Sequence, residues 1–292
     1  MIATLREPAR NLPVTGAFDV VVAGGGIGGV AAAVAAARTG VSVCLLEKEC
    51  SLGGLATVGN VTVWLPICDG KGRQVIGGIG EELLRLAVHD LRQTNRAAGF
   101  VGVPACWEPG GDPAERQQTR FTSQFNPAAY ILGLELWVLD AGVKLMYDTR
   151  LCAVRRSRGK VTHVIVENKS GRSAIACRTA IDATGDADLC FLAGEETESL
   201  DCNVGAAWFY YLKEGAVHLH TSSRAFSANL RRDELKCPGY RGDDAEQVTE
   251  QVLDSRRLTR DECARLSAKY PETDIQPFAL PSIPCFRATR RL

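Results

Sequence analysis

The pattern of apolar and polar positions near the start of the chain predicts a strand, then a helix, then a second strand. Asp19–Ala23 is a short β-branched apolar run, typical of a strand buried on both faces. Gly28–Thr39 has high helix propensity and is followed by Gly40, which suits a C-cap. Val41–Glu47 predicts a second buried strand, parallel to the first across a right-handed crossover. Residues 1–17 contain two prolines and are expected to form an irregular lead-in.

The middle of the chain predicts two helices and a group of antiparallel strands. Apolar residues recur at helical spacing in 78–95 and in 126–142, and the latter has Pro127 in its first turn and a glycine at its end. Residues 99–120 hold Gly, Pro and charge and predict an exposed loop. Residues 143–188 alternate between apolar and polar positions, which predicts a hairpin or a three-stranded meander.

The pattern changes beyond Gly194. Residues 206–223 predict strands, and Asp243–Lys269 predicts one or two charged, solvent-facing helices. Residues 277–292 predict extended chain.

Composition and charge exclude several classes of partner. The chain has 34 basic and 34 acidic residues, so no global field attracts nucleic acid or an anionic membrane. The N-terminus lacks the apolar core of a signal peptide, and the longest apolar stretch is too short to cross a bilayer. We therefore expect a soluble cytoplasmic protein with no nucleic-acid or membrane partner; the oligomeric state stays open.

The cysteines predict packing residues rather than disulfides or metal ligands. There are eleven, an odd number, scattered singly and without any CxxC pair. Most are expected to be reduced, and Cys44 is expected to point from a buried strand.

The turn after the first strand carries the candidate chemistry. Gly24, Gly26 and Gly29 fit G-x-G-x-x-G between a strand and a helix. The first glycine permits a tight turn, the second lets a pyrophosphate approach the backbone, and the third lets the helix pack on the strand. Glu47 ends the second strand, where a carboxylate can accept hydrogen bonds from a ribose hydroxyl. Glycines at a crossover can be purely structural, but with Glu47 in this context the pattern favours a dinucleotide, either FAD or NAD.

Two further motifs give the sequence a family resemblance. "EKECSLGGLAT" carries a glycine pair shortly after the acidic residue, and "AIDATGDAD" follows the predicted meander. In this order the chain resembles the FAD-binding flavoproteins of the glutathione-reductase-like superfamily. More narrowly, it is similar to the bacterial FAD-dependent oxidoreductases, with the motifs spread over residues 19–188. The resemblance implies FAD as cofactor and hydride transfer between the flavin and a small-molecule substrate.

The resemblance also implies four groups of cofactor contacts. The pyrophosphate would lie on the glycine loop, at Gly24, Gly26, Ile27, Gly28 and Gly29. The adenosine would meet Glu47, Lys48 and the main chain at Leu151 and Cys152. The path toward the flavin would be lined by Gly54, Leu55, Ala56 and Thr57. The loop closing over the cofactor would be Thr184, Gly185 and Asp186, although Asp186 is equally suited to cap the next helix.

By resemblance the fold class is α/β: a Rossmann-type FAD/NAD(P)-binding domain over residues 18–194, with a parallel sheet and a β-meander. Residues 195–292 would form a partial α+β substrate domain. Members of the family return near their C-terminus with a strand and helix that contact the flavin ring, and no such return precedes Leu292. We therefore expect a chain truncated before that segment. The alternative to an enzyme is a truncated, non-catalytic FAD- or NAD-binding module.

Several expected features of related enzymes are missing. Cys44 and Cys50 do not have the spacing of a redox disulfide, and no second glycine loop follows a strand, so a built-in NAD(P)H domain is not expected. No catalytic base is identified: His89 is predicted to be a mid-helix surface or packing residue. His218 and His220 would share a strand face, but no carboxylate or cysteine lies near them in sequence, so no metal site is predicted.

Three other groups have two interpretations each. The acidic residues near the second motif are a metal cluster or, more simply, strand-end and capping groups: Asp182, Asp186 and Asp188. Trp64 approaches the flavin or packs in the core. The terminal arginines bind a carboxylate substrate or form a solvated basic end: Arg287, Arg290 and Arg291.

Overall fold

The structure is a computed structural model that describes residues 4–89, 100–224, 239–285 and 289–292. Its larger sheet has the strand order β5-β2-β1-β8-β7-β6. The strands of this sheet are β1 (Val14–Ala23), β2 (Val43–Leu46), β5 (Lys144–Met146), β6 (Arg150–Ser157), β7 (Lys160–Asn168) and β8 (Gly171–Asp182). β5, β2, β1 and β8 run parallel, and β6, β7 and β8 form an antiparallel meander. The predicted meander and the parallel βαβ unit are therefore both confirmed.

Successive side chains of β1 and β2 point alternately into two hydrophobic cores, one on each face of the sheet. The buried parts of these strands are therefore almost wholly apolar. Val22 and Leu45 pack against the helices α1 (Ile27–Ala37), α2 (Ile79–Ala87) and α3 (Pro127–Asp140). Val21 and Cys44 face the opposite way, toward the meander and the short helix α4 (Asp188–Leu192). The parallel strands are thus covered on both faces, as such strands usually are.

Helix ends follow the capping signals in the sequence. The side chain of Asn126 accepts a hydrogen bond from the N–H of Ala128, so it caps α3 with Pro127 in the first turn. Gly142, just beyond the helix, has a φ of 76°, which favours glycine.

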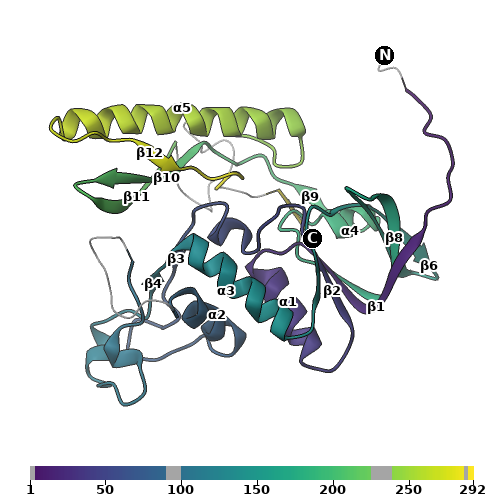
Figure 1. Ribbon diagram of the computed structural model, residues 1–292, viewed down its shortest axis with the longest axis horizontal. Coiled ribbons are helices and arrows are strands. Elements are labelled where there is room, and N and C mark those ends of the chain that lie inside the picture. Colours follow the sequence, from purple (N-terminus) through teal and green to yellow (C-terminus); the bar gives the residue numbers. More distant parts are fainter. Residues whose placement is uncertain (1–3, 90–99, 225–238, 286–288) are drawn as a thin grey trace.

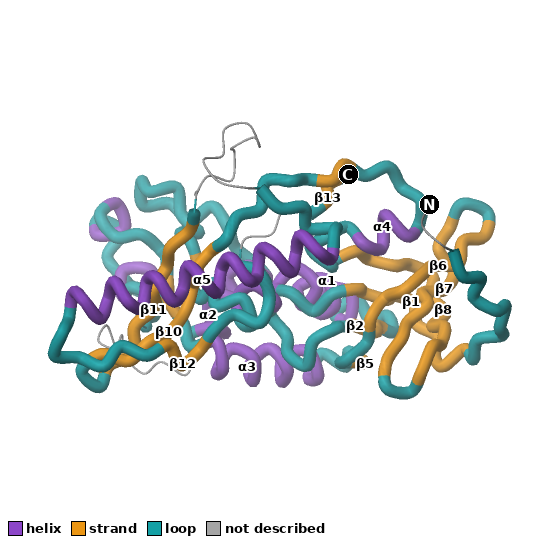
Figure 2. The backbone as a smooth tube through the Cα atoms, turned by 90° about the horizontal axis from the view of Figure 1, so that it is seen from above, coloured by secondary structure: helices purple, strands orange, loops and turns teal. Residues whose placement is uncertain are grey.

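The smaller sheet consists of β11 (Ala216–Ser223), β10 (Ala206–Lys213) and β12 (Pro277–Ala279). A single helix, α5 (Ala245–Lys269), packs on it, with Phe209 and Leu258 in the shared core. Figure 1 shows α5 and this sheet on one side of the molecule and β1, β6 and β8 on the other. Seen from above, α5 crosses in front of β10 and β11 (Figure 2).

Short elements link these parts. They are the 3₁₀ helices η1 (Gly54–Ala56), η3 (Ala105–Trp107) and η4 (Glu115–Gln117), with the two-residue strands β3 (Val63–Trp64), β4 (Ser123–Gln124), β9 (Glu198–Ser199) and β13 (Arg290–Arg291). β3 pairs with β4, and β9 pairs with β13.

Three expectations about the fold were wrong. β1 begins at Val14, inside the expected lead-in, because Val14, Gly16 and Ala17 pair with β8. The loop predicted over 99–120 is not wholly exposed in its described part, residues 100–120: Cys106 and Trp107 are buried, and Trp107 stacks on Phe121 with 5.2 Å between ring centroids. His89 follows the end of α2 instead of lying within it, and the predicted continuation to residue 95 lies outside the described residues.

Two general expectations can be compared with the described part of the chain. Its cysteines are all free, and burial raises the pKa of the Cys44 thiol to about 12, so this thiol stays protonated at neutral pH. No described helix combines the length and the apolar character required to span a bilayer.

Candidate cofactor-binding site

A cavity of about 650 Å³ opens at the carboxyl ends of β1, β2 and β8. Residues directly following all three strands line it, among them Gly24, Glu47 and Ala183. In open α/β sheets ligands bind at this edge, where successive connections leave the central strand in opposite directions. The volume lies within the usual range for sites of small molecules and cofactors.

The glycine loop has two kinds of glycine. A Cβ on Gly29 would lie 1.8 Å from the carbonyl oxygen of Gly24, so this glycine lets α1 pack against the end of β1. Gly24 itself has a φ of 102°. By contrast, a Cβ on Gly26 or Gly28 would meet no atom within 4 Å, and both residues line the cavity. The loop is therefore tight on its protein side and open on its cavity side.

The open side presents the N-terminus of α1. Gly26 is the N-cap, no side chain caps the helix there, and its first turn holds no acidic residue. The first N–H groups of a helix lack intrahelical partners and lie at the positive end of the helix dipole, which favours an anion.

The carboxylate of Glu47 is fixed at the rim of the cavity. The side chain is buried, with Oε2 accepting a hydrogen bond from the N–H of Gly25 at 2.6 Å and Oε1 accepting one from the N–H of Glu49 at 2.8 Å. These bonds leave further lone pairs, since an ionised carboxylate has about four acceptor sites. Glu47 thus offers an oriented acceptor next to the glycine loop.

The glycine pair, Gly53 and Gly54, packs directly against the glycine loop. The N–H of Gly53 donates to the carbonyl oxygen of Gly25 at 2.9 Å. A Cβ on Gly54 would lie 3.2 Å from Cα of Gly26, so a larger residue would press into the loop. Both glycines have positive φ angles, of 100° and 53°. Leu55 and Ala56, in η1, continue the wall of the cavity.

The loop after β8 is organised by Asp182. Its Oδ1 accepts hydrogen bonds from the N–H and the hydroxyl of Thr184, at 3.0 and 2.7 Å, and its Oδ2 accepts one from the N–H of Cys190. Asp182 is therefore a turn and capping residue. Asp188 instead pairs with Arg290, and the N-cap position of α4 is Ala187, so a capping role is seen for Asp182 and not for the other two acidic residues.

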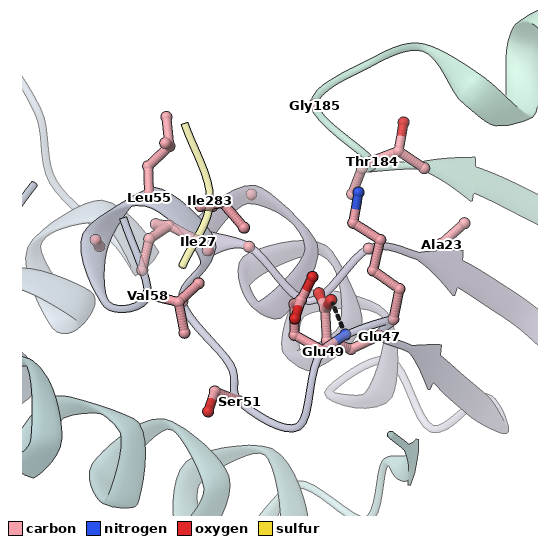
Figure 3. A pocket seen from close by; sticks show the side chains of 18 of the residues that line it. Ala23, Ile27, Glu47, Glu49, Ser51, Leu55, Val58, Thr184, Gly185 and Ile283 are labelled. Atoms are coloured by element: carbon pink, nitrogen blue, oxygen red, sulfur yellow. Dashed lines mark hydrogen bonds between the residues drawn. The ribbon is translucent and has the colours of Figure 1, made fainter. Parts of the chain in front are cut away.

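The end of the cavity away from Glu47 is apolar. Leu55 and Ile283 lie at this end, and the cavity's apolar lining also includes Val58, Val61, Val63, Trp64 and Phe125. Figure 3 shows Leu55, Ile27 and Ile283 close together and apart from Glu47 and Glu49. Ile283 comes from residues 195–292, which carry the smaller sheet and are called the second lobe below. The neighbouring N–H of Ser282 donates to the carbonyl oxygen of Val58 at 2.8 Å.

Most of the sequence-predicted site residues meet at this cavity. Those that line it are Gly24, Gly26, Ile27, Gly28, Glu47, Lys48, Gly54, Leu55, Ala56, Leu151, Thr184 and Gly185. Those that do not are Gly29, Thr57, Cys152 and Asp186. Thr57 is buried behind the glycine pair, where its hydroxyl donates to the carbonyl oxygen of Leu52. Asp186 is also buried, with Oδ2 3.9 Å from Nζ of Lys48.

Sequence reasoning missed several residues of the cavity wall: Glu49, Ser51, Thr149, Arg150, Phe125, Asp188 and Ile283. Glu49, Ser51 and Arg150 were within reach, because they neighbour residues that the motifs did identify. Trp64 lines the cavity and also packs against the core, so its two interpretations are not exclusive.

The remaining candidates lie in the second lobe. His218 and His220 share a strand face as predicted, but a carboxylate does lie near them: Oε2 of Glu262, on α5, is 3.2 Å from Nε2 of His220. Arg290 is neither a solvated end nor open to a substrate, because its largely covered side chain pairs with Asp188. Arg291 pairs with Glu198 at the surface, and Arg287 lies outside the described residues.

A family model described as FAD dependent oxidoreductase matches residues 19–260. The chain belongs to the FAD-dependent oxidoreductases. FAD is accordingly its cofactor, and the cavity fits this group: it combines an uncapped helix N-terminus, glycines with open space where a Cβ would project, and an oriented carboxylate. No curated protein matches the chain.

The chain also has a low similarity to several solved structures. A geranylgeranyl bacteriochlorophyll reductase-like protein from Thermoplasma acidophilum has 16% identity and a TM-score of 0.46, over 68% of this chain and 47% of that one. A myxobacterial chondrochloren halogenase, a variant of the FAD-dependent halogenases, has 22% identity and a TM-score of 0.46, over 67% of this chain and 44% of that one. An L-proline dehydrogenase from P. horikoshii has 15% identity and a TM-score of 0.42, over 69% of this chain and 61% of that one. The chain thus spans less than two thirds of each of these proteins.

Proposed function

We propose that the chain is an oxidoreductase that holds FAD in this cavity and acts on a small molecule. When bound, the flavin supplies the acceptor or donor of a hydride. The protein's part is to bind the dinucleotide, orient its ring and shield that ring from water. The open cavity side of the glycine loop at Gly26 and Gly28 is the observation that carries this proposal.

Each wall of the cavity has a role in this proposal. The first turn of α1 holds the diphosphate through main-chain N–H groups. Glu47 accepts hydrogen bonds from the adenosine ribose, while Lys48 and the main chain at Leu151 lie beside the adenine. Gly54, Leu55 and Ala56 guide the dinucleotide toward the apolar end, and Thr184 and Gly185 close over it.

The apolar end is where we place the flavin ring and the adjacent substrate. Leu55, Val58 and Ile283 exclude water there, which protects a hydride from loss to solvent. Because Ile283 lies in residues 195–292, we propose that this part of the chain contributes to the substrate side, and that 18–194 is the FAD-binding domain.

Reconstitution with FAD tests the proposal. The purified chain is incubated with FAD, freed of unbound cofactor by gel filtration and examined by visible absorption. A retained flavin band, bleached anaerobically by a substrate or by a reduced nicotinamide, is the expected result. A retained band that no donor bleaches would indicate a non-catalytic binding module.

Thermal unfolding measured with FAD and with NAD tests the alternative that the chain binds NAD instead. Ligands that bind only the folded state raise the unfolding midpoint. A rise with NAD and none with FAD would overturn the proposal. A cytoplasmic location and the lack of nucleic-acid and membrane partners remain predictions from the sequence.

A further inference from the structure

The described C-terminal residues return to the loop that borders the cavity. β13 pairs with β9, and the carbonyl oxygen of Thr289 accepts a hydrogen bond from the N–H of Leu200 at 2.8 Å. This brings Arg290 beside α4, which follows directly from the loop after β8. Residues far apart in sequence thus meet next to the proposed cofactor site.

The guanidinium of Arg290 is held on several sides. Its Nη1 donates to the main-chain oxygen of Asp186 at 3.1 Å and to Oδ1 of Asp188 at 2.7 Å. Its Nε lies 3.7 Å from Oδ2 of Asp243, and the group sits 4.4 Å from the ring centroid of Phe191. Only 11% of the side chain is exposed, so this cation is placed by specific partners and not by solvent.

The two residues that accept hydrogen bonds from Arg290, Asp186 and Asp188, lie on either side of a residue in an unfavourable backbone conformation. Ala187, the N-cap of α4, has φ 52° and ψ 34°, in the left-handed region that non-glycine residues rarely adopt. Such a residue persists where its surroundings over-determine it. Arg290 contacts the residue before Ala187 and the residue after it, and so bridges the strained position.

The same loop faces the cavity. Thr184, Gly185 and Asp188 line it, whereas Arg290 does not. Any change in the path of the loop at Ala187 would therefore move the groups that we place over the dinucleotide.

We propose that Arg290 is a positioning residue for the cofactor: it locks the loop 184–188 in the conformation that closes over FAD, and so makes cofactor affinity depend on the second lobe. This inference rests on the proposed function, because it assigns the cavity to FAD. Arg290 itself touches neither the cofactor nor the substrate in this account.

Two arginine variants with a built-in control test the proposal. Arg290→Met keeps an unbranched aliphatic side chain at this position and removes the guanidinium, with its hydrogen bonds and its contact with Phe191. Arg291→Met, at the next residue, removes only a surface pair with Glu198. FAD affinity is measured by quenching of flavin fluorescence. The visible circular dichroism of bound flavin reports whether the loop is closed. Hydrogen exchange of residues 184–190, followed without FAD, reports how firmly the loop is held in the apoprotein.

We expect Arg290→Met to raise the Kd for FAD about 5-fold or more, to alter the visible dichroism, and to speed exchange in the loop; Arg291→Met leaves all three unchanged. Arg290→Lys, which keeps the charge but not the planar fork, should fall between wild type and Arg290→Met, and it decides the matter if Arg290→Met does not fold. Wild-type affinity in Arg290→Met, or an equal loss in Arg291→Met, would overturn the inference alone. A wild-type chain that binds no FAD would overturn the proposed function as well.

Discussion

We predict that the variant Gly26→Ala weakens FAD binding but leaves the stability of the fold nearly unchanged. The backbone at Gly26 has φ −64° and ψ 176°, which alanine adopts freely, and a Cβ there meets no protein atom within 4 Å. Replacing glycine at a compatible position stabilises a protein by about 0.4–1 kcal/mol, whereas alanine is a poorer N-cap than glycine. These effects oppose each other, so we expect the free energy of unfolding of the apoprotein to change by less than about 0.5 kcal/mol.

The same methyl group projects into the space that we assign to the diphosphate. Forcing an extra methyl group into a packed contact costs about 1–3 kcal/mol. That penalty corresponds to a Kd for FAD raised about 5- to 150-fold. Urea unfolding of the apoprotein and fluorescence titration with FAD measure the two quantities separately.

Two matched glycine variants complete the test. Gly77→Ala lies outside the cavity, and its Cβ makes only an ordinary 3.8 Å contact with Gln74, so FAD binding should be unchanged. Gly29→Ala would collide with the carbonyl oxygen of Gly24 and should destabilise the fold itself. Wild-type FAD affinity in Gly26→Ala would refute the placement of the diphosphate on this loop.

Two further predictions concern stability. Asn126→Ala removes the cap of α3 and should lower the free energy of unfolding by about 1 kcal/mol, measured by urea unfolding, with Asn126→Asp as the variant that retains it; equal loss in both variants would speak against the cap. Burial lowers the pKa of His220 in the folded state, against the opposing charge of Glu262. The unfolded chain therefore takes up this proton first, so stability should fall as pH drops below about 6.5, and His220→Gln should flatten that decline. An identical pH profile in the variant would show that His220 does not contribute.

Local signals in the sequence were sufficient for the first βαβ unit. β1, α1 and β2 follow from apolar runs divided by glycines, whose roles depend on residues only a few positions away. The third loop glycine is one example, because its close neighbour is Gly24. Glu47 was found for the same reason, since strand-end position and spacing are both readable from the chain.

Residues whose environment comes from distant segments could not be found in this way. Ile283 enters the cavity from the second lobe, and Glu262 meets His220 only because α5 packs on the smaller sheet. Trp107 looked like part of an exposed loop, because nothing in its local sequence indicates the core it shares with Phe121. Arg290 was misread likewise, since its partners near Asp188 lie about a hundred positions earlier.

Thr57 and Asp186 show a different limit. Both belong to motifs that border the cavity, yet neither residue lines it. Thr57 bonds to Leu52, and Asp186 lies near Lys48. A motif identifies the stretch of backbone that reaches a site, but not which of its side chains face the site.

A crystal structure of the chain reconstituted with FAD tests the central claim most directly. The account predicts the diphosphate within about 3 Å of main-chain N–H groups in the first turn of α1. It also predicts the ribose on Glu47 and the flavin ring between Leu55 and Ile283. A dinucleotide bound elsewhere, or bound here with its diphosphate away from Gly26 and Gly28, would contradict it.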